Sequence, residues 1–491
     1  MLAAAATLVA AAPASAGPRS SARFPESLPA LSAAPSTDRG GRIVDARGRE
    51  VLLRGVNVDV LADYARASSL PAVNPFTPTD LALLRASGWN LVRLQLSWSR
   101  IEPRPGQYDD AYLAEAAKYV ETFRGAGIYT ILDFHQDAWG ASLGARPGEL
   151  CPPGLQPALG WDGAPAWATL VSPLTPRCFA GSKEINPAVT EAWTAFWADA
   201  RGIRTSYVAM LAYVARKLGT SDAVAGYDVM NEPGAFTAPE QAALGGLYAD
   251  ALRAIRGAER VAGAAPRLFL FQPDARWSAL GRGAPPDFAR DANVVYAPHV
   301  LSDPVSRSAF QTARDEARRF GGAPVLIGEW GATPGRGQSY FTEHQDLQDT
   351  FAMSSALWAW SEGCGSPRRL ARGGSAPVLG LLDADCATGR VAGGRTDLIR
   401  RLGRAYVRAT PGRLHGQRYR GLTGRFSAVG EAPAGNRQSL LVFYPGWKHR
   451  NARFRARGLA NLRAVRTPGE GRFVTAIPRG PWSLEIGPRL P

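Results

Sequence analysis

The segment that decides the fold runs from residue 224 to residue 233 and reads VAGYDVMNEP. Its first half is a short β-rich run, and its second half gathers an amide, a carboxylate and a proline where that run ends. Runs of this kind recur along the chain and alternate with stretches of helical period, which is the pattern of βα units. The β-rich runs are residues 51–58, 91–98, 128–135, 224–231, 268–271, 294–300, 325–330 and 356–360.

The stretches between these runs predict helices. They cover residues 111–124, 192–218, 239–257, 307–320 and 341–353, and a last helix is expected over 396–407. Eight strands alternating with helices over about 370 residues predict an α/β fold, a (β/α)8 TIM barrel. The largest insertion, residues 139–186, follows the third strand and is rich in Gly, Pro and Trp.

Four segments are expected along the chain. Residues 1–16 are predicted to be a signal peptide, because an apolar, Ala-rich run ends in Ala14-Ser15-Ala16, although the usual basic residues before it are missing. The alternative is an Ala-rich disordered end. Residues 17–40 are expected to form a flexible leader, residues 41–410 the barrel, and residues 411–491 a small antiparallel β-sandwich domain. The protein is therefore expected to be secreted or held at the cell surface.

Composition excludes several classes of protein. With 45% apolar and 20% charged residues the chain is globular, and no apolar run reaches the roughly 18 residues of a membrane-spanning helix. The net charge of +15 comes from arginine, and an arginine bias is weak evidence for nucleic-acid binding, so no nucleic-acid partner is expected. The protein is predicted to be a monomer. Four cysteines in an exported chain suggest two disulfides. Of three possible pairings, the one that joins nearest neighbours is favoured, Cys151 with Cys178 and Cys364 with Cys386.

Two glutamates stand at the ends of expected strands. Glu232 ends the fourth strand and Glu329, in GEWG at 328–331, ends the seventh. In a barrel the carboxyl ends of the strands surround one mouth, so these carboxyls are expected to face each other. One carboxyl to protonate the leaving oxygen and one to attack the anomeric carbon are what hydrolysis of a glycosidic bond requires. Two unrelated surface glutamates are the alternative, which leaves the flanking Asn231 and Pro233 unexplained.

Arg93 lies inside an otherwise apolar strand, where a guanidinium needs a carboxylate partner. Glu329 is the expected partner. Arg93 would then keep Glu329 ionised, while the negative charge of Glu329 would raise the pKa of Glu232. The alternative is a structural ion pair between Arg93 and an aspartate on a neighbouring strand.

Alternation along the third strand projects Asp133, His135 and Asp137 to one side. A metal site is possible there, but two carboxylates and one histidine make a poor zinc set, so neither a metal nor a cofactor is expected. Binding of sugar hydroxyls by His135 and Asp137, with Asp133 orienting His135, fits better. His299 ends the sixth strand, and Trp360 at the end of the eighth offers a flat face for a sugar ring.

These residues resemble the clan A, family-five retaining glycoside hydrolases. More narrowly, three motifs resemble bacterial endoglycoceramidases, LDFHQD at 132–137, GAPAWAT at 163–169 and YDVMNEP at 227–233. The resemblance runs from about residue 42 to residue 407. It implies a cofactor-free enzyme that cuts between the glycan and the ceramide of a glycosphingolipid and carries a C-terminal β-sandwich. It also implies that Glu232 is the acid/base, Glu329 the nucleophile and Asn231 the ligand of the sugar 2-hydroxyl.

The chain departs from the family at one position and adds one feature. The family has His-x-Tyr after the sixth strand, with the phenol on the nucleophile, whereas this chain has His299-Val300-Leu301. Another tyrosine could replace it, or the nucleophile could depend on Arg93 alone. Residues 415–491 carry 13 Arg and one Lys against three Glu, a balance of +11. Peripheral contact with an anionic membrane surface is therefore expected, with a solvated, Arg-rich surface as the alternative.

Two competing functions stay open. One is a β-glucanase or β-glucosidase of the same clan that acts on soluble glycans, and the other is a non-catalytic carbohydrate-binding protein on a barrel scaffold. Retention of Glu232, Glu329, Arg93 and Asn231 together counts against the second, because binding alone needs no such separation of charge.

Overall fold

The computed structural model describes residues 28–65, 68–302, 304–332, 338–370, 379–386, 390–392, 396–446, 452–466 and 471–488. The predicted signal peptide lies outside these residues. Within them, no helix combines the length and the apolar character that a membrane span needs.

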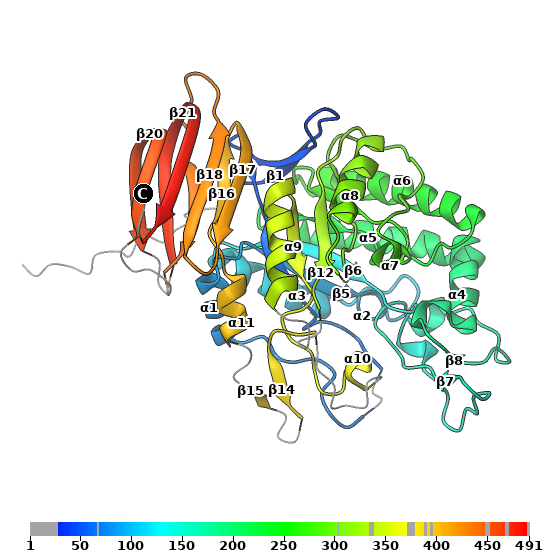
Figure 1. The fold of residues 1–491 in the computed structure, drawn as a ribbon. Coiled ribbons are helices and arrows are strands. Elements are labelled where there is room, and N and C mark those ends of the chain that lie inside the picture. The colour runs from blue at the N-terminus through cyan, green and yellow to red at the C-terminus, as the bar shows by residue number, and fades with distance from the viewer. Residues whose placement is uncertain are drawn as a thin grey trace, which may run out of the picture.

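Eight parallel strands form the predicted barrel (Figure 1). Their order in the sheet is β11-β10-β9-β6-β5-β4-β13-β12, and a parallel bridge from Tyr296 to Val325 joins the two ends of this series. Seven lie within the predicted runs, and the eighth is shifted to 354–357 from the predicted 356–360; all are largely buried on both faces, as parallel strands covered by helices are. They are β4 (Arg54–Val58), β5 (Leu91–Ser97), β6 (Tyr129–His135), β9 (Val224–Asp228), β10 (Leu268–Phe271), β11 (Val294–Tyr296), β12 (Leu326–Trp330) and β13 (Ser354–Leu357).

Helices surround the barrel and follow most of its strands. One prediction was wrong: residues 192–218 are two helices, because Asp199, Arg201 and Gly202 between them have φ angles of 49°, 54° and 74°, which a right-handed helix cannot contain. The last expected helix is also shorter, since it ends at Leu402. The described helices are α1 (Pro78–Ala86), α2 (Trp98–Ile101), α3 (Asp110–Gly125), α4 (Pro187–Trp197), α5 (Ile203–Leu218), α6 (Ala238–Val261), α7 (Trp277–Leu280), α8 (Arg307–Arg319), α9 (Gln338–Phe351), α10 (Pro367–Leu370) and α11 (Thr396–Leu402).

Capping residues fix where helices begin. Thr237 and Glu240 form a capping box at the start of α6, and Asp109 accepts hydrogen bonds from two backbone N–H groups at the start of α3. Each of these helices begins on the side of the barrel where the preceding strand ends. The caps therefore set the lengths of the loops that form the mouth.

The insertion after β6 is mostly irregular. It contains a two-residue pairing of β7 (Gln156–Pro157) with β8 (Cys178–Phe179) and several short 3-10 turns. Both predicted disulfides are confirmed, Cys151–Cys178 within this insertion and Cys364–Cys386 after β13, with Cα–Cα distances of 5.7 and 5.5 Å. A short hairpin of β14 (Asp383–Asp385) and β15 (Arg390–Ala392) follows.

In place of the predicted C-terminal β-sandwich, one connected antiparallel sheet stands beside the barrel, and it takes strands from both ends of the chain (Figure 1). The predicted boundaries need correction, because β1 lies within the expected leader, β2 and β3 lie within the expected barrel, and β16 begins before residue 411. Strands of three to six residues carry too little alternation to be assigned to a sheet from sequence. The strands are β1 (Leu31–Ala34), β2 (Arg42–Asp45), β3 (Arg49–Val51), β16 (Tyr406–Pro411), β17 (Arg413–Arg420), β18 (Arg425–Glu431), β19 (Leu440–Pro445), β20 (Arg453–Arg466) and β21 (Gly471–Gly487).

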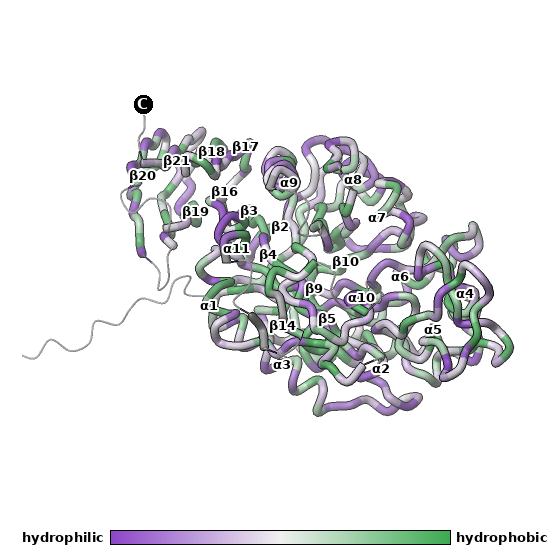
Figure 2. The backbone as a smooth tube through the Cα atoms, turned by 60° about the horizontal axis from the view of Figure 1, so that its bottom comes forward, coloured by the Kyte–Doolittle hydropathy of each residue, from purple (hydrophilic) through white to green (hydrophobic). Residues whose placement is uncertain are grey.

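The sheet and the start of the barrel share one hydrophobic core. Leu91, Ile131 and Leu326, near the first residues of barrel strands, belong to the same buried cluster as Val442 and Phe443 of β19. Apolar segments occupy the centre of the molecule around β9 and β10 (Figure 2). Gly88, with a φ of +76°, lies against the ring of Phe443 so closely that a β-carbon there would come within 2.1 Å of it. The sheet therefore closes the end of the barrel where its strands begin, opposite their carboxyl ends.

Candidate active site

The two predicted glutamates lie together at the mouth of the barrel. Glu329 is the fourth residue of β12, and Glu232 lies in the loop after β9. The Nδ1 atom of His299, which follows β11, is 2.9 Å from Oε1 of Glu232 and 3.7 Å from Oε2 of Glu329. Because one nitrogen reaches both carboxyls, these two oxygens lie less than about 7 Å apart, a limit that is compatible with the carboxyl spacing of about 5 to 5.5 Å in retaining glycosidases.

Arg93 is fully buried and its guanidinium joins five acceptors. Both interpretations of Arg93 are correct at once, because it binds Glu329 Oε1 at 3.0 Å and also pairs with aspartates of the neighbouring β6 and β9. Three carboxylates around one guanidinium raise the pKa of Arg93 against the burial that lowers it, so the cation is permanent. The other acceptors are Asp133 Oδ1 at 2.7 Å, Asp228 Oδ2 at 2.9 Å, Asn231 Oδ1 at 2.8 Å and Asn57 Oδ1 at 2.9 Å.

Two glutamines hold Glu232 in a strained conformation. The φ angle of Glu232 is +38°, which is costly for a residue with a side chain. Gln272 accepts a hydrogen bond from the backbone N–H of Glu232 at 2.9 Å. Gln136 donates to the carbonyl oxygens of Asn231 and Glu232 at 2.7 and 2.8 Å. Sequence analysis missed both glutamines, although each directly follows a predicted strand, and that position was the available signal.

The charges of the two glutamates differ from the sequence prediction. Burial tends to raise the pKa of Glu232, but hydrogen bonds and charge from His299 lower it below the usual range. Burial raises the pKa of Glu329, with His299 and Arg93 opposing that rise. The predicted order of the two pKa values is therefore reversed in the structure. The reason is the contact between His299 and Glu232, since the sequence assigned His299 to sugar binding alone.

Asp133 links Arg93 to His135. Its Oδ2 atom lies 2.8 Å from Nδ1 of His135, so the expected orienting contact is present. Burial lowers the pKa of His135, but the carboxylates of Asp133 and Asp137 raise it to about 10. The ring of His135 also stacks on Trp358, with centroids 5.1 Å apart and planes at 16°. His135 is thus a fixed cation with one face covered.

Trp358, rather than Trp360, lies in the site. Trp360 is 1% exposed and packs in the outer core, with Trp89 at 6.1 Å and Phe76 at 6.5 Å between ring centroids. The prediction for Trp360 as a sugar platform was wrong, because β13 ends at Leu357 and the polypeptide after it directs Trp358 to the mouth instead. Beyond its contact with His135, Trp358 lies under the guanidinium of Arg368 at 4.9 Å.

A second group of charged side chains extends the site along one wall. Asp137 forms ion pairs with Lys183 and with Arg368, the latter at 3.6 Å, and these cations lower its pKa against burial. Lys183 and Arg368 also lie over the ring of Trp161, at 4.3 and 5.7 Å. Burial raises the pKa of the nearby Asp59 to about 7, with the charge of Glu362 adding to the rise. Aromatic faces beside fixed charges and hydroxyl-binding groups suit a sugar.

Sequence analysis missed Lys183, Arg368, Trp161 and Asp59. They come from the segments that follow three different strands, with Arg368 on the short helix α10, and no local motif joins them. Ser278 of α7, which donates to Glu232, was missed for the same reason. Within the described residues, no group of three His, Cys, Asp or Glu side chains is arranged to hold a metal ion.

The absent tyrosine has no replacement on Glu329 in the described part of the chain. There Glu329 receives a side-chain hydrogen bond from Arg93, and its other contact is His299. Leu301 therefore leaves the candidate nucleophile dependent on two cations.

Comparison with known proteins gives a consistent result. Residues 44–363 match the model of the cellulase family, glycosyl hydrolase family 5. Endoglycoceramidase I from Rhodococcus hoagii is 32% identical over 197 residues, which cover 40% of this chain and 36% of that protein. The match thus spans about a third of that relative's length.

Solved structures extend the likeness to the whole fold. A crystal structure of endogalactoceramidase superposes with a TM-score of 0.83 at 35% identity, and the alignment covers 93% of this chain and 99% of the other. Endo-glycoceramidase II from Rhodococcus sp. has been solved with ganglioside GM3, with a TM-score of 0.70 at 22% identity and coverage of 93% and 100%. Its lactosyl-enzyme intermediate gives a TM-score of 0.68 at 22% identity, with coverage of 91% and 99%. At 22% identity, the likeness to Endo-glycoceramidase II shows that the two proteins share a fold.

Proposed function

The chain belongs to glycosyl hydrolase family 5, and on that premise we propose that it is a retaining β-glycosidase that cleaves the bond between the glycan and the ceramide of glycosphingolipids. The observation that carries the proposal is the pair Glu232 and Glu329 bridged by His299, with Arg93 on Glu329. His299 contacts both carboxyls, Arg93 contacts only Glu329 of the two, and both carboxyls face one mouth. A binding protein needs no such arrangement.

In the proposed mechanism Glu329 attacks the anomeric carbon and forms a covalent glycosyl-enzyme. The bond from that carbon to the glycosidic oxygen breaks, and Glu232 donates its proton to the oxygen as ceramide leaves. Glu232 then takes a proton from water, whose oxygen attacks the same carbon and releases Glu329. Two inversions retain the configuration. Arg93 favours the ionised form of Glu329 at the start of each cycle.

His299 supplies charge control at the other carboxyl. Its ring nitrogen Nδ1 lies 2.9 Å from Glu232 Oε1 and, as an N–H donor, stabilises ionised Glu232. A protonated Glu232 is needed once the substrate is bound, so the proton that His299 and Glu232 share is the one the leaving oxygen receives. Asn231 is proposed to hold the sugar 2-hydroxyl, and His135, Asp137 and Trp358 to hold the rest of the first sugar.

The relatives support a glycolipid as substrate. Proteins named endoglycoceramidase and endogalactoceramidase match by sequence and by fold, and the Rhodococcus enzyme was solved with a ganglioside. The competing soluble-glycan activity calls for a polar cleft on both sides of the cut. Residues 150–176, which reach the site at Trp161, expose no formal charge, and that favours a lipid aglycone.

Secretion, a monomeric state and contact with anionic membranes complete the proposal. An Ala-rich N-terminal run supports secretion. The exposed arginines of β20, among them Arg453, Arg455 and Arg457, support electrostatic attraction to anionic headgroups.

The decisive experiment incubates the purified protein with a panel of glycosphingolipids and soluble β-glucosides and identifies products by mass. We expect an intact oligosaccharide and free ceramide. Release of single sugars from the non-reducing end, or turnover of soluble glucans alone, would replace the proposal with the β-glucosidase or β-glucanase alternative.

A further inference from the structure

One loop of the insertion after β6 has an unusual composition. Residues 150–176, here named the uncharged loop, contain a single charged residue, Asp162, and Asp162 is fully buried. The whole chain is 20% charged. At that frequency about five charged residues would occur over such a length. The described surface of this loop is therefore free of formal charge.

The same loop exposes large apolar side chains. Leu150 is 92% exposed, Leu174 is 89% exposed and Leu155 is 37% exposed. Single exposed leucines are common on protein surfaces, but several on one loop without charge mark an interaction surface. The Cys151–Cys178 disulfide, with Cα atoms 5.7 Å apart, ties the residue after Leu150 to the segment that follows Leu174.

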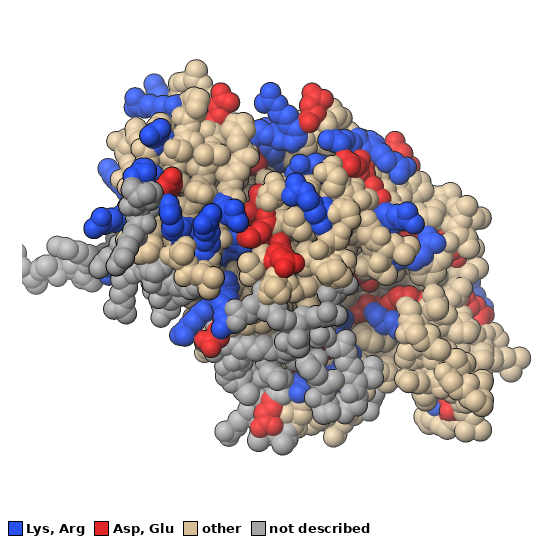
Figure 3. Space-filling model, viewed as in Figure 1, with Lys and Arg blue, Asp and Glu red and all other residues tan. Residues whose placement is uncertain are grey.

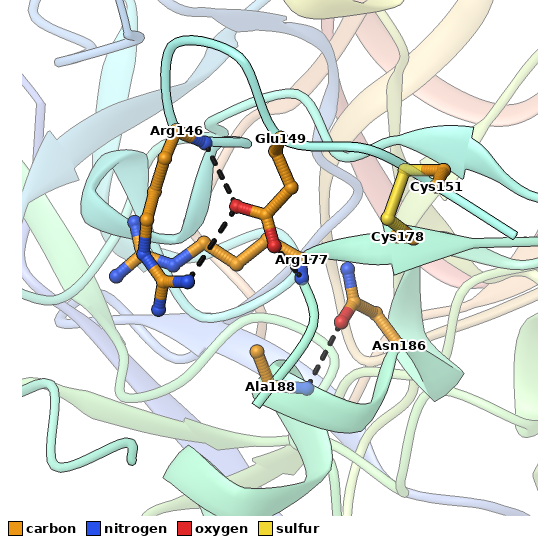
Figure 4. Close-up of a disulfide and its surroundings, with 7 residues drawn as sticks. All are labelled: Arg146, Glu149, Cys151, Arg177, Cys178, Asn186 and Ala188. Carbon is orange, nitrogen blue, oxygen red and sulfur yellow. Dashed lines mark hydrogen bonds and ion pairs between the residues drawn. A yellow bond between two sulfur atoms is a disulfide. The ribbon is translucent and has the colours of Figure 1, made fainter. Parts of the chain in front are cut away.

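Hydrogen bonds hold the leucines in place. Glu149 accepts from the backbone N–H groups of Arg146 and Arg177, beside the disulfide (Figure 4). On the other segment, Glu191 of α4 accepts from the backbone N–H of Ser172 and from the hydroxyl of Thr175, at 2.9 and 2.5 Å. The exposed side chains thus stand on a fixed framework.

The loop is continuous with the active site. Asp162 in its middle accepts hydrogen bonds from Ser97, the last residue of β5, and from Gln95. Trp161 beside it carries Lys183 and Arg368 on its ring. The outer parts near β7 and β8 lie at the edge of the molecule (Figure 1), where the surface in Figure 3 is nearly all uncharged. The uncharged loop therefore runs from the mouth of the barrel, at Trp161 and Asp162, out to the edge of the molecule near β7 and β8.

We propose that the uncharged loop inserts Leu150 and Leu174 into the lipid bilayer that carries the substrate, and so docks the mouth of the barrel on the membrane. The inference rests on the proposed function, which places the substrate in a bilayer. A bilayer is the occupant that fits, because its acyl-chain region accepts apolar side chains and excludes charge. A loop without formal charge also has no means of steering toward a charged protein partner.

This contact differs from the electrostatic attraction proposed for β20. Insertion of leucines depends on buried apolar area, so it persists on zwitterionic lipid and at high salt. Attraction of arginines needs anionic lipid and weakens as salt screens it.

The test measures binding first, without turnover. The Glu232→Gln protein is sedimented with phosphatidylcholine vesicles, with and without glucosylceramide, in about 0.5 M salt, where the Debye length falls below about 5 Å. The Leu150→Ser, Leu174→Ser double variant is expected to partition about 10-fold less onto both kinds of vesicle. The matched control is Val261→Ser with Leu422→Ser, which removes side chains 79% and 99% exposed at the end of α6 and in the β17–β18 turn. The control should partition as the parent does.

Activity with Glu232 intact then tests the purpose of docking. The Leu150→Ser, Leu174→Ser variant should lose about 10-fold on vesicle-embedded glycolipid and retain its rate on detergent-dispersed glycolipid. Unchanged sedimentation would overturn the inference. So would an equal loss on both substrates, or a leucine-dependent dimer in size-exclusion chromatography. If no glycolipid is cleaved at all, the proposed function fails, while sedimentation on phosphatidylcholine alone still decides whether the loop binds a bilayer.

Discussion

Arginine occurs both at the mouth of the barrel and on strand β20, but it is buried at the mouth and exposed to solvent on the strand. Arg93 is fully buried, and four of its five acceptors lie on strands of the barrel. Arg453, Arg455 and Arg457 are exposed on the outer strand of the antiparallel sheet. A buried charge acts on its neighbours with little screening, whereas salt reduces the effect of an exposed charge within about 8 to 10 Å. The same residue type should therefore give very different results when it is changed.

The largest effect is expected at the two carboxyls. Glu232→Gln and Glu329→Gln should each reduce turnover by at least about 10³-fold, because each removes an entire chemical role. Initial rates on the preferred glycolipid measure this, with melting temperature as the control for folding. Azide should rescue Glu329→Ala with inverted product and Glu232→Ala with retained product. Near-normal rates in a folded variant would remove the assignment.

Arg93→Met comes next. It leaves Asp133, Asp228 and Glu329 without their shared cation, so we expect a loss of about 10²-fold in kcat/KM together with a clear fall in melting temperature. The pKa of Glu329 rises when Arg93 is lost, and because the nucleophile must be ionised, the acidic limb of the pH–rate profile should move to higher pH. Arg453→Met is the exposed counterpart, and it should leave kcat/KM, the melting temperature and the acidic limb unchanged. An unmoved acidic limb would mean that Arg93 acts only in folding.

His299→Gln tests whether one histidine controls the pKa of both glutamates. His299 contacts both carboxyls, so its loss should raise both pKa values and move both limbs of the profile to higher pH. Arg93→Met should move the acidic limb alone. The comparison uses kcat/KM of each variant across pH. A shift of one limb only in His299→Gln would show that it serves a single carboxyl.

The pH dependence of stability provides a smaller effect. The folded pKa of His135 is about 10, raised from the usual 6.5. A raised histidine pKa stabilises the fold fully below pH 6.5, and this stabilisation is lost as pH rises through 10. The free energy of unfolding of the wild type should therefore fall over this interval more steeply than that of His135→Gln. Parallel curves from urea titrations at several pH values would contradict the charge assigned to His135.

The smallest effect is expected at β20. Changing Arg453, Arg455 and Arg457 together to glutamate should reduce activity on glycolipid in anionic vesicles by about 5-fold at low salt and leave detergent-dispersed substrate unaffected. Raising the salt should lower the rate of the wild type toward that of the variant. Equal loss on both substrates would indicate a folding role for the strand, and no loss on either would leave these arginines as a solvated surface.

The same contrast explains what could be predicted from sequence. Strands and their terminal glutamates were recognised because each run is buried and continuous, and because Arg93 stands out against an apolar strand. The sequence could not show whether Trp358 or Trp360 reaches the active site, because both follow β13 and the path of the chain after Leu357 decides which one does. The pKa order of Glu232 and Glu329 depended on where His299 points. Lys183 and Arg368 reach the site on loops whose course no periodicity records.

Strands β1 to β3 lie in one sheet with the C-terminal strands, and Phe443 of that sheet lies against Gly88 of the barrel. Neither end of the described chain can therefore be removed without opening a shared core. We expect calorimetry to give a single cooperative unfolding transition for the whole molecule. A barrel cut from its sheet would be a poor starting point for engineering, and changes in substrate preference should be introduced through the loops at the other end.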